Sequence, residues 1–141
     1  TFNQGFDTTE YIAAALLDME WHTIPAGMEI TDFNQFEKDA LAKHGMDYQV
    51  IPPRYKSAYF SHIFSGGYSS GYYAYLWAEV FAADGFDYMT KNGGLNRKNG
   101  DNYRNNVLSM GNSQELMQNY INFRGQKPNI DALLRRRGIV E

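Results

Sequence analysis

The sequence predicts an all-α protein of about six helices, with one long helix near residues 69–91. Apolar residues recur at helical spacing in several segments, and a glycine or proline follows nearly every one of them. Alternation of the kind typical of a β-strand is confined to residues 48–51. With 141 residues, of which 43% are hydrophobic, the chain is long enough to bury a core.

Start and stop signals locate the first two helices. Asp7 and Glu10 have the spacing of a capping box, so we expect the first helix to begin at Asp7 and to run through Trp21. A second helix is expected from a cap at Asp32 to a stop near Gly45.

The middle of the chain is expected to form an extended connection followed by the long helix. Residues 46–61 contain Pro52 and Pro53, which cannot continue a helix. The helix over residues 69–91 is apolar on nearly all sides, so we expect it to be buried. Three shorter helices, each followed by a glycine, are expected over residues 96–110, 113–123 and 129–137.

Composition narrows the classes of function. A net charge of -3 argues against nucleic acid or an anionic membrane as a partner. The absence of cysteine excludes disulfides, thiolate metal sites and cysteine nucleophiles. No apolar run is long enough to span a bilayer, so we expect no membrane insertion, and the cytoplasm is the expected compartment, with the periplasm left open. The opening Thr1-Phe2, without an initiator Met, is typical of a segment cut from a longer protein.

The most unusual stretch covers residues 62–77 and reads HIFSGGYSSGYYAYLW. Two adjacent glycines, Gly66 and Gly67, permit backbone conformations closed to other residues and allow a ligand to approach closely. If the long helix reached back far enough, three tyrosines at positions i, i+4 and i+7 would share one face: Tyr68, Tyr72 and Tyr75. Phenol hydroxyls can donate to a carbonyl oxygen as it gains negative charge. Spacing alone favours the alternative, an aromatic core helix whose hydroxyls bond to backbone.

The three histidines do not form a metal-binding motif. None begins the H-E-x-x-H pattern of a helical zinc site. His22 and His44 lie in the last turns of predicted helices, where we expect structural roles. A separate zinc site built from the histidines with Asp18 or Glu79 is a further alternative, which nothing in the spacing favours.

The segment from Tyr59 to Phe86, YFSHIFSGGYSSGYYAYLWAEVFAADGF, closely resembles the C-terminal region of the thimet oligopeptidase and oligopeptidase A family of zinc metallopeptidases, and most of all its peptidyl-dipeptidase branch. The resemblance extends to FNQGF at residues 2–6, IPPR at 51–54, GLNR at 94–97 and LSMGNS at 108–113. It therefore covers essentially the whole chain.

This resemblance implies a fold and a reaction. Members of the family are large helical peptidases that enclose a channel, and their H-E-x-x-H helix lies upstream of the region matched here. Residues 1–141 would then be one C-terminal segment of the catalytic domain, with Zn²⁺ held by the missing N-terminal part of the same polypeptide. The implied activity is removal of dipeptides from the C-terminus of oligopeptide substrates, and the segment alone is expected to be inactive.

The resemblance also assigns site residues. Catalytic roles fall to Tyr75 and Tyr68 as donors to the developing oxyanion and to His62, which would hold a substrate carbonyl. The substrate-binding set comprises His62, Tyr68, Tyr72, Tyr75, Gly66, Gly67 and Arg54. Arg54 and its neighbour Lys56 are candidates for binding the free carboxylate of the substrate.

Two other expectations concern the isolated chain. A non-catalytic helical module that binds peptides or a partner through the same tyrosines is the alternative to an enzyme. An excised segment of a larger helical body would also expose apolar faces, so we expect that the fragment is able to dimerise.

Overall fold

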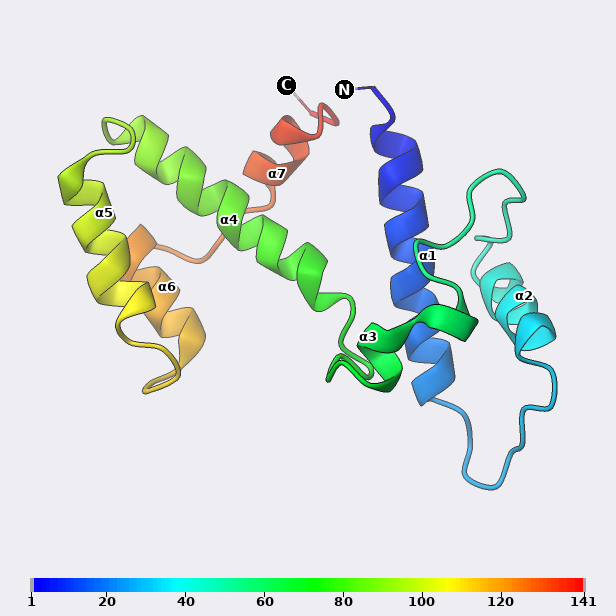
Figure 1. Cartoon of the computed structure of the whole chain (residues 1–141). Helices are drawn as coiled ribbons and strands as arrows, with labels where there is room; N and C mark the ends of the chain where they lie inside the picture. The colour runs from blue at the N-terminus through cyan, green and yellow to red at the C-terminus, as the bar shows by residue number, and fades with distance from the viewer. Residues whose placement is uncertain (1, 141) are drawn as a thin grey trace. The chain divides into compact units, whose positions relative to one another are not determined.

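The computed structural model describes residues 2–140, and the chain divides into two compact units, residues 2–75 and residues 76–140. The helices, shown in Figure 1, are α1 (Gln4–His22), α2 (Phe33–Lys43), the 3₁₀ turn η1 (Ser57–Tyr59), α3 (Ser61–Phe64), α4 (Ala74–Lys91), α5 (Arg97–Tyr103), the π-helical turn η2 (Arg104–Leu108), α6 (Leu116–Arg124) and α7 (Asp131–Arg136). Residues 2–140 contain no β-strand. The predicted all-α class is confirmed.

Helix α1 forms the centre of the first unit, and α2 lies alongside it (Figure 1). On one side, Ala13 and Leu17 of α1 pack against Ala40 and Leu41 of α2. On another side, Ala14 packs against a second cluster, whose buried members are Phe60, Ile63 and Tyr72. Small residues on α1 let these aromatic rings approach the helix closely, so α1 supports both halves of the unit.

Bonds to Ser57 hold the connection between α2 and α3. The carboxylate of Glu37 accepts from the Ser57 backbone N–H at 2.7 Å and from its hydroxyl at 2.8 Å. The indole N–H of Trp21 donates to the same hydroxyl at 2.9 Å. The expected non-helical connection is therefore present, interrupted only by the short turn η1, and it is fixed to both α1 and α2.

The start of α2 was predicted correctly and that of α1 was not. The Asp32 carboxylate caps α2 by accepting from the N–H groups of Asn34 and Gln35. Helix α1 begins at Gln4, after Asn3 in a left-handed conformation, and no side chain caps it. Asp7 lies inside its first turn, where a carboxylate still favours the positive end of the helix. That preference accounts for the misplaced start.

Helix α4 differs from the prediction at its start and in its burial. It begins at Ala74 instead of residue 69, because Ser70 has a left-handed φ of 53° that a right-handed helix cannot contain. It is not buried on nearly all sides, since Trp77 is 56% exposed and Phe86 is 59% exposed. Its buried face comprises Val80, Ala83, Asp84 and Gly85.

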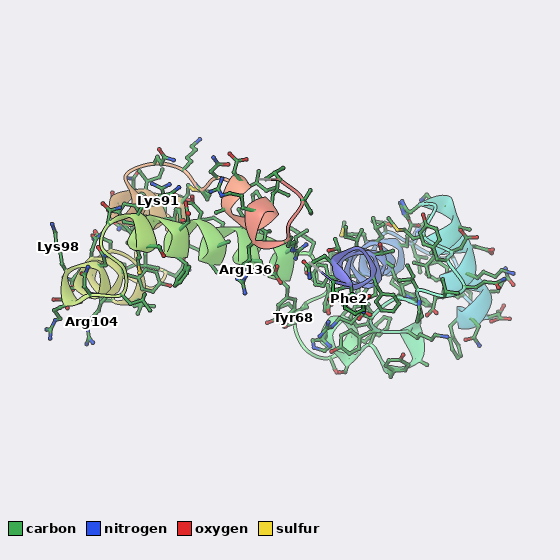
Figure 2. All side chains as sticks on the ribbon, turned by 90° about the horizontal axis from the view of Figure 1, so that it is seen from above. Phe2, Tyr68, Lys91, Lys98, Arg104 and Arg136 are labelled. Atoms are coloured by element: carbon green, nitrogen blue, oxygen red, sulfur yellow. The ribbon has the colours of Figure 1, made fainter. Side chains whose placement is uncertain are left out.

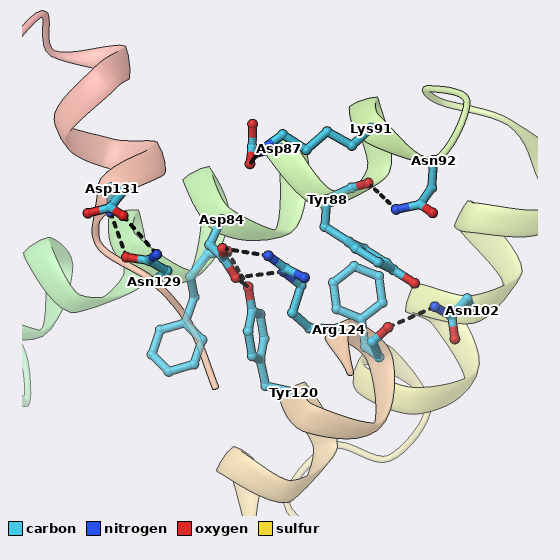
Figure 3. Close-up of polar contacts among 12 residues, drawn as sticks. Asp84, Asp87, Tyr88, Lys91, Asn92, Asn102, Tyr120, Arg124, Asn129 and Asp131 are labelled. Carbon is cyan, nitrogen blue, oxygen red and sulfur yellow. Dashed lines mark hydrogen bonds and ion pairs between the residues drawn. The ribbon is translucent and has the colours of Figure 1, made fainter. Parts of the chain in front are cut away.

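In the second unit, α6 and α7 pack on that buried face of α4. Ala132 and Leu133 of α7 contact Val80 and Ala83. From α6, the Tyr120 hydroxyl donates to the Asp84 carboxylate at 2.6 Å and the Arg124 guanidinium donates to it at 3.0 Å, as Figure 3 shows. Only one face of α4 is covered in this way, which explains why the rest of the helix remains exposed.

The end of α4 is closed by a side chain from α5. The Asn99 amide donates to the carbonyl oxygens of Met89, Asn92 and Gly94 at 2.7 to 3.2 Å. Exposed basic residues of this region, Lys98 and Arg104, project outward in Figure 2. The last three predicted helices are present with shorter bounds, and the glycines expected to end them, Gly111, Gly125 and Gly138, all have positive φ. Among the described residues, no helix has both the length and the apolar character needed to cross a membrane.

Candidate active site

The glycine-rich loop folds back over α3 because of two glycines. A Cβ on Gly66 would lie 2.8 Å from Cα of His62, so a larger residue would collide with backbone. Gly67 adopts φ +81°, which L side chains rarely adopt. The N–H of Tyr68 then donates to the carbonyl of His62 at 3.0 Å. The loop therefore returns Tyr68 to the backbone of α3.

The next turn is held by α1. The carboxylate of Asp18 accepts from the N–H of Ser70 at 3.0 Å and from the N–H of Tyr72 at 2.9 Å. The hydroxyl of Tyr11 donates to the carbonyl of Tyr72 at 2.8 Å. Backbone groups of the turn thus bond to two side chains of one helix.

Aromatic rings surround His62 as a result. Its ring centroid lies 4.6 Å from Tyr55, 6.3 Å from Tyr68 and 6.5 Å from Tyr75. The rings of Tyr68 and Tyr75 stack at 5.0 Å with an interplanar angle of 29°. The histidine and the two tyrosines named as catalytic candidates are therefore neighbours in one cluster, all within the first unit.

The three predicted tyrosines differ in exposure. Tyr68, labelled in Figure 2, is 37% exposed and Tyr75 is 39% exposed, whereas Tyr72 is 3% exposed. Burial raises the pKa of Tyr72 to about 12. The pKa of Tyr75 is raised mainly by a hydrogen bond with Tyr68 and to a smaller extent by burial. The phenols of Tyr72 and Tyr75 are protonated at neutral pH, and the side chains of Tyr68 and Tyr75 are partly open to solvent.

One nitrogen of His62 is unusual. Its Nδ1 is buried and has no hydrogen-bond partner among residues 2–140. Buried polar atoms in native proteins are nearly always hydrogen-bonded, because leaving one unpaired costs about 1–3 kcal/mol. An orphaned imidazole nitrogen beside two phenols is a feature that packing alone does not explain.

Arg54 lies at the edge of this cluster. Its N–H donates to the carbonyl of Glu10 at 3.0 Å, and Nη1 lies 3.8 Å from the Glu10 carboxylate. Its side chain is 53% exposed. A hydrogen bond with Tyr55 raises the pKa of Arg54, and the ring of Tyr55 also contacts His62. The guanidinium is therefore a charged, accessible group linked to the ring cluster through Tyr55.

Comparison with known proteins identifies the family of the chain. Residues 1–139 match the model of peptidase family M3. The chain belongs to peptidase family M3. Over 138 residues it is 46% identical to dipeptidyl carboxypeptidase from Salmonella typhimurium and to the enzyme of the same name from Escherichia coli, and each match covers 98% of this chain and 20% of the relative. It is also 50% identical to oligopeptidase A from Escherichia coli over 80 residues, 57% of the chain and 12% of the relative. The chain thus spans about a fifth of the length of the dipeptidyl carboxypeptidases it matches.

The resemblance to this peptidase family that the sequence predicted is confirmed. Two of the three histidines of this M3 segment lie beside carboxylates. His22 Nδ1 lies 2.8 Å from the Asp18 carboxylate, and His44 Nε2 lies 2.8 Å from the Glu20 carboxylate. Within residues 2–140, no three His, Cys, Asp or Glu side chains come together as a metal ion requires. The described part of the chain does not fit a zinc site by itself.

Three residues of the M3 segment were not assigned to the site from the sequence. Tyr55 contacts His62 directly, whereas Tyr11 and Asp18 hold the turn that carries Tyr72. The excess of tyrosine, eleven in the chain, was a signal for Tyr55 and Tyr11 without indicating which tyrosines would meet. Asp18 had no local signal for this role, because its partners in the turn, Ser70 and Tyr72, lie more than fifty residues along the chain.

A separate cavity lies in the second unit. It has a volume of about 550 Å³ and is lined mainly by apolar side chains of α4, η2 and α6, among them Phe81, Phe86, Val107 and Phe123. No histidine or carboxylate of the described residues lines it. The cavity can hold an apolar group and offers no acid or base, so it is a weaker candidate for the chemistry of an M3 peptidase than the ring cluster.

Proposed function

We propose that this chain is the C-terminal segment of the catalytic domain of a zinc peptidase that removes dipeptides from the C-terminus of oligopeptides. The observation that carries the proposal is the stacked pair Tyr68 and Tyr75, partly exposed beside His62. The dipeptidyl carboxypeptidases are 46% identical to this chain over 98% of it, whereas the oligopeptidases A that match 99% of the chain are 35% identical. This higher identity over nearly the whole chain favours release of dipeptides over internal cleavage.

The zinc ion belongs to the part of the protein outside residues 1–141. When bound there, it would act as a Lewis acid toward the substrate carbonyl and would lower the pKa of a bound water. The residues of this chain contribute the polar groups that position the peptide and stabilise charge. The isolated segment is accordingly expected to lack peptidase activity.

Tyr75 and Tyr68 are suited to stabilise a developing oxyanion. Hydrolysis of a peptide bond places negative charge on the former carbonyl oxygen, and preorganised donors stabilise that charge more strongly than the neutral ground state. A phenol with the ordinary pKa of about 10 is protonated at neutral pH and can donate, and the hydrogen bond with Tyr68 raises the pKa of Tyr75 further. A phenol does this without adding a formal charge to the site.

His62 is suited to hold a neighbouring carbonyl of the peptide. Its unpartnered, buried Nδ1 lies on a ring between Tyr55 and the two exposed phenols. The residue as a whole is partly exposed, and an imidazole N–H can donate to a peptide carbonyl.

Substitution of Tyr75 in the full-length enzyme tests the proposal. Tyr75→Phe keeps the ring and removes the hydroxyl, so we expect kcat to fall about 100- to 1000-fold with little change in KM. Tyr73→Phe is the matched control, because Tyr73 is a neighbouring tyrosine that is 54% exposed and has no assigned role. An unchanged kcat in Tyr75→Phe would refute the role, and peptide binding without hydrolysis by the full-length protein would support a binding module instead.

A further inference from the structure

We propose that Asp18 is a positioning residue for the phenol pair, and that its buried carboxylate sets the turn at residues 70–72, which has Tyr68 and Tyr75 on either side. This inference rests on the function proposed above. Asp18 lies on α1, far along the chain from the glycine-rich segment, and its bonds to that segment are made to backbone N–H groups. It would therefore act on the phenols through the backbone.

The burial of Asp18 requires compensation. The residue is fully buried, and a buried carboxylate is strongly unfavourable unless it is hydrogen-bonded or paired. Its partners are backbone N–H groups of Ser70 and Tyr72 together with Nδ1 of His22. Each carboxylate oxygen is used, Oδ1 by Ser70 and Oδ2 by Tyr72. The carboxylate of Asp18 therefore binds the turn and does not contact solvent.

The turn needs such a partner because its backbone is strained. Ser70 has a φ of 53°, in the left-handed region that residues other than glycine rarely occupy. In this conformation the N–H groups of residues 70 and 72 point at one carboxylate. Charge-assisted hydrogen bonds are the strong kind, so Asp18 offsets the strain. An asparagine in the same position would place an NH₂ donor where one of these two N–H groups now meets an oxygen.

Backbone hydrogen bonds connect the turn to the two residues that carry the phenols. The N–H of Gly71 donates to the carbonyl of Tyr68 at 2.8 Å, and the N–H of Tyr75 donates to the carbonyl of Tyr72 at 3.3 Å. Tyr68 and Tyr75 are thus each one backbone hydrogen bond away from the turn that Asp18 holds. A shift of the turn would separate or rotate the stacked rings.

A second side chain of α1 supports the same assignment. Tyr11 is seven residues before Asp18, about two helical turns, so both side chains lie on one face of α1. Its hydroxyl donates to the carbonyl of Tyr72, whose N–H is bound by Asp18. Helix α1 therefore holds both polar backbone groups of Tyr72.

Asp18→Asn in the full-length enzyme is the direct test. We expect kcat to fall about tenfold or more with KM changed less than about threefold, because the substrate still binds while the donors are displaced. Amide exchange at Ser70 and Tyr72, followed by mass spectrometry, should become faster.

Leu17→Ala is the control for a general loss of packing in α1. Leu17 is the buried residue next to Asp18, and it packs against Ala40 and Leu41 of α2, in a cluster that includes no residue of the turn. This variant should lower stability and leave kcat unchanged at a temperature where both variants are folded.

A double-mutant cycle shows whether Asp18 acts through the phenol. If it does, the loss of kcat in the combined Asp18→Asn and Tyr75→Phe variant will be smaller than the product of the two single losses. Ser70→Gly, which removes the strain of the left-handed residue, should restore part of the activity lost in Asp18→Asn. Losses that multiply fully, or an absence of rescue, would overturn the proposal.

The same experiments separate this proposal from the function on which it rests. If Tyr75→Phe leaves kcat unchanged, the proposed function fails. Amide exchange at residues 70 and 72 tests Asp18 independently of that result. Unchanged protection of these amides in Asp18→Asn would show that Asp18 does not hold the turn. Should Asp18→Asn not fold, Tyr11→Phe removes the second bond from α1 and keeps the ring. Unchanged kcat together with unchanged exchange at Tyr72 in that variant would also overturn the proposal.

Discussion

The rings of Tyr68 and Tyr75 stack with centroids 5.0 Å apart although the two residues belong to no common helix. Tyr68 precedes the turn and Tyr75 lies in the first turn of α4. The hydrogen bond with Tyr68 raises the pKa of Tyr75, which keeps the phenol of Tyr75 protonated beyond its usual range. The pair is therefore a donor site whose geometry depends on the loop between its members.

The stability of the protein should fall at alkaline pH because of Tyr72. Its pKa is about 12 in the folded state and about 10 when unfolded, so the folded state keeps a proton that the unfolded state releases between these values. The contribution is complete below about pH 10 and is lost as pH rises toward about 12. Urea unfolding of the full-length protein at about pH 9 and about pH 11 should show a larger loss for the wild type than for Tyr72→Phe. Equal losses would contradict the assignment.

Asp84 should contribute far more to stability than its neighbour Asp87. Asp84 is 1% exposed and binds Arg124 and Tyr120, so Asp84→Ala leaves a mostly buried guanidinium without its partner and should cost about 3–5 kcal/mol. Asp87 forms a surface ion pair with Lys91, and Asp87→Ala should cost less than about 1 kcal/mol. Thermal unfolding of both variants in the full-length protein measures the difference. Similar shifts in Tm would show that the buried pair is not a stabilising contact.

Two glycines should respond in opposite directions to alanine. In Gly66→Ala the new Cβ would meet the backbone of His62 at 2.8 Å, so the loop must move and kcat should fall along with stability. Gly100 lies in α5 with nothing within 4 Å of an added Cβ and no positive φ, so Gly100→Ala should stabilise the helix by about 1 kcal/mol. Calorimetry and a peptidase assay on the two full-length variants check both signs. A Gly66→Ala enzyme with full activity would show that the close approach of Gly66 to the backbone of His62 is not needed for catalysis.

Arg54 should contribute to recognition of the free C-terminus of a substrate. Its exposed guanidinium can bond to a carboxylate, and loss of such a charge-assisted bond typically reduces binding about tenfold or more. We expect Arg54→Ala to weaken the preference of the full-length enzyme for a free-acid peptide over its C-terminal amide. Lys56→Ala tests the other candidate for the same carboxylate, and Arg97→Ala, which removes an exposed arginine of α5, is the control. Unchanged discrimination in Arg54→Ala would remove Arg54 from the substrate-binding set.

Several elements followed from local patterns, and the exceptions have physical causes. The cap at Asp32 and the glycine stops were predictable because a helix end depends on residues within a few positions of it. The early start assigned to α4 was wrong because the backbone turns at Ser70 to meet Asp18, a partner far away along the chain. The predicted burial of α4 was wrong because apolar content alone does not show which neighbours cover a helix.

The residues of the candidate site were assigned from the family resemblance, and a shared helical face was considered only if the long helix reached back to Tyr68. No helix within residues 2–140 contains Tyr68, Tyr72 and Tyr75 together. The loop and turn gather their rings around His62 instead, with Tyr72 buried beneath. The roles assigned to these residues stay predictions, whereas their proximity is a property of the fold.

The bonds from Asp18 to Ser70 and Tyr72 bear on how much of the chain is needed to build this arrangement. A synthetic peptide covering residues 59–86 would contain every glycine and tyrosine of the motif, but it would lack the helix that orders them. Such a peptide would adopt many loop conformations. Transfer of the motif to another protein would require a carboxylate equivalent to that of Asp18. The smallest transferable unit is the stretch from α1 to the start of α4, joined by contacts that close a long loop of chain.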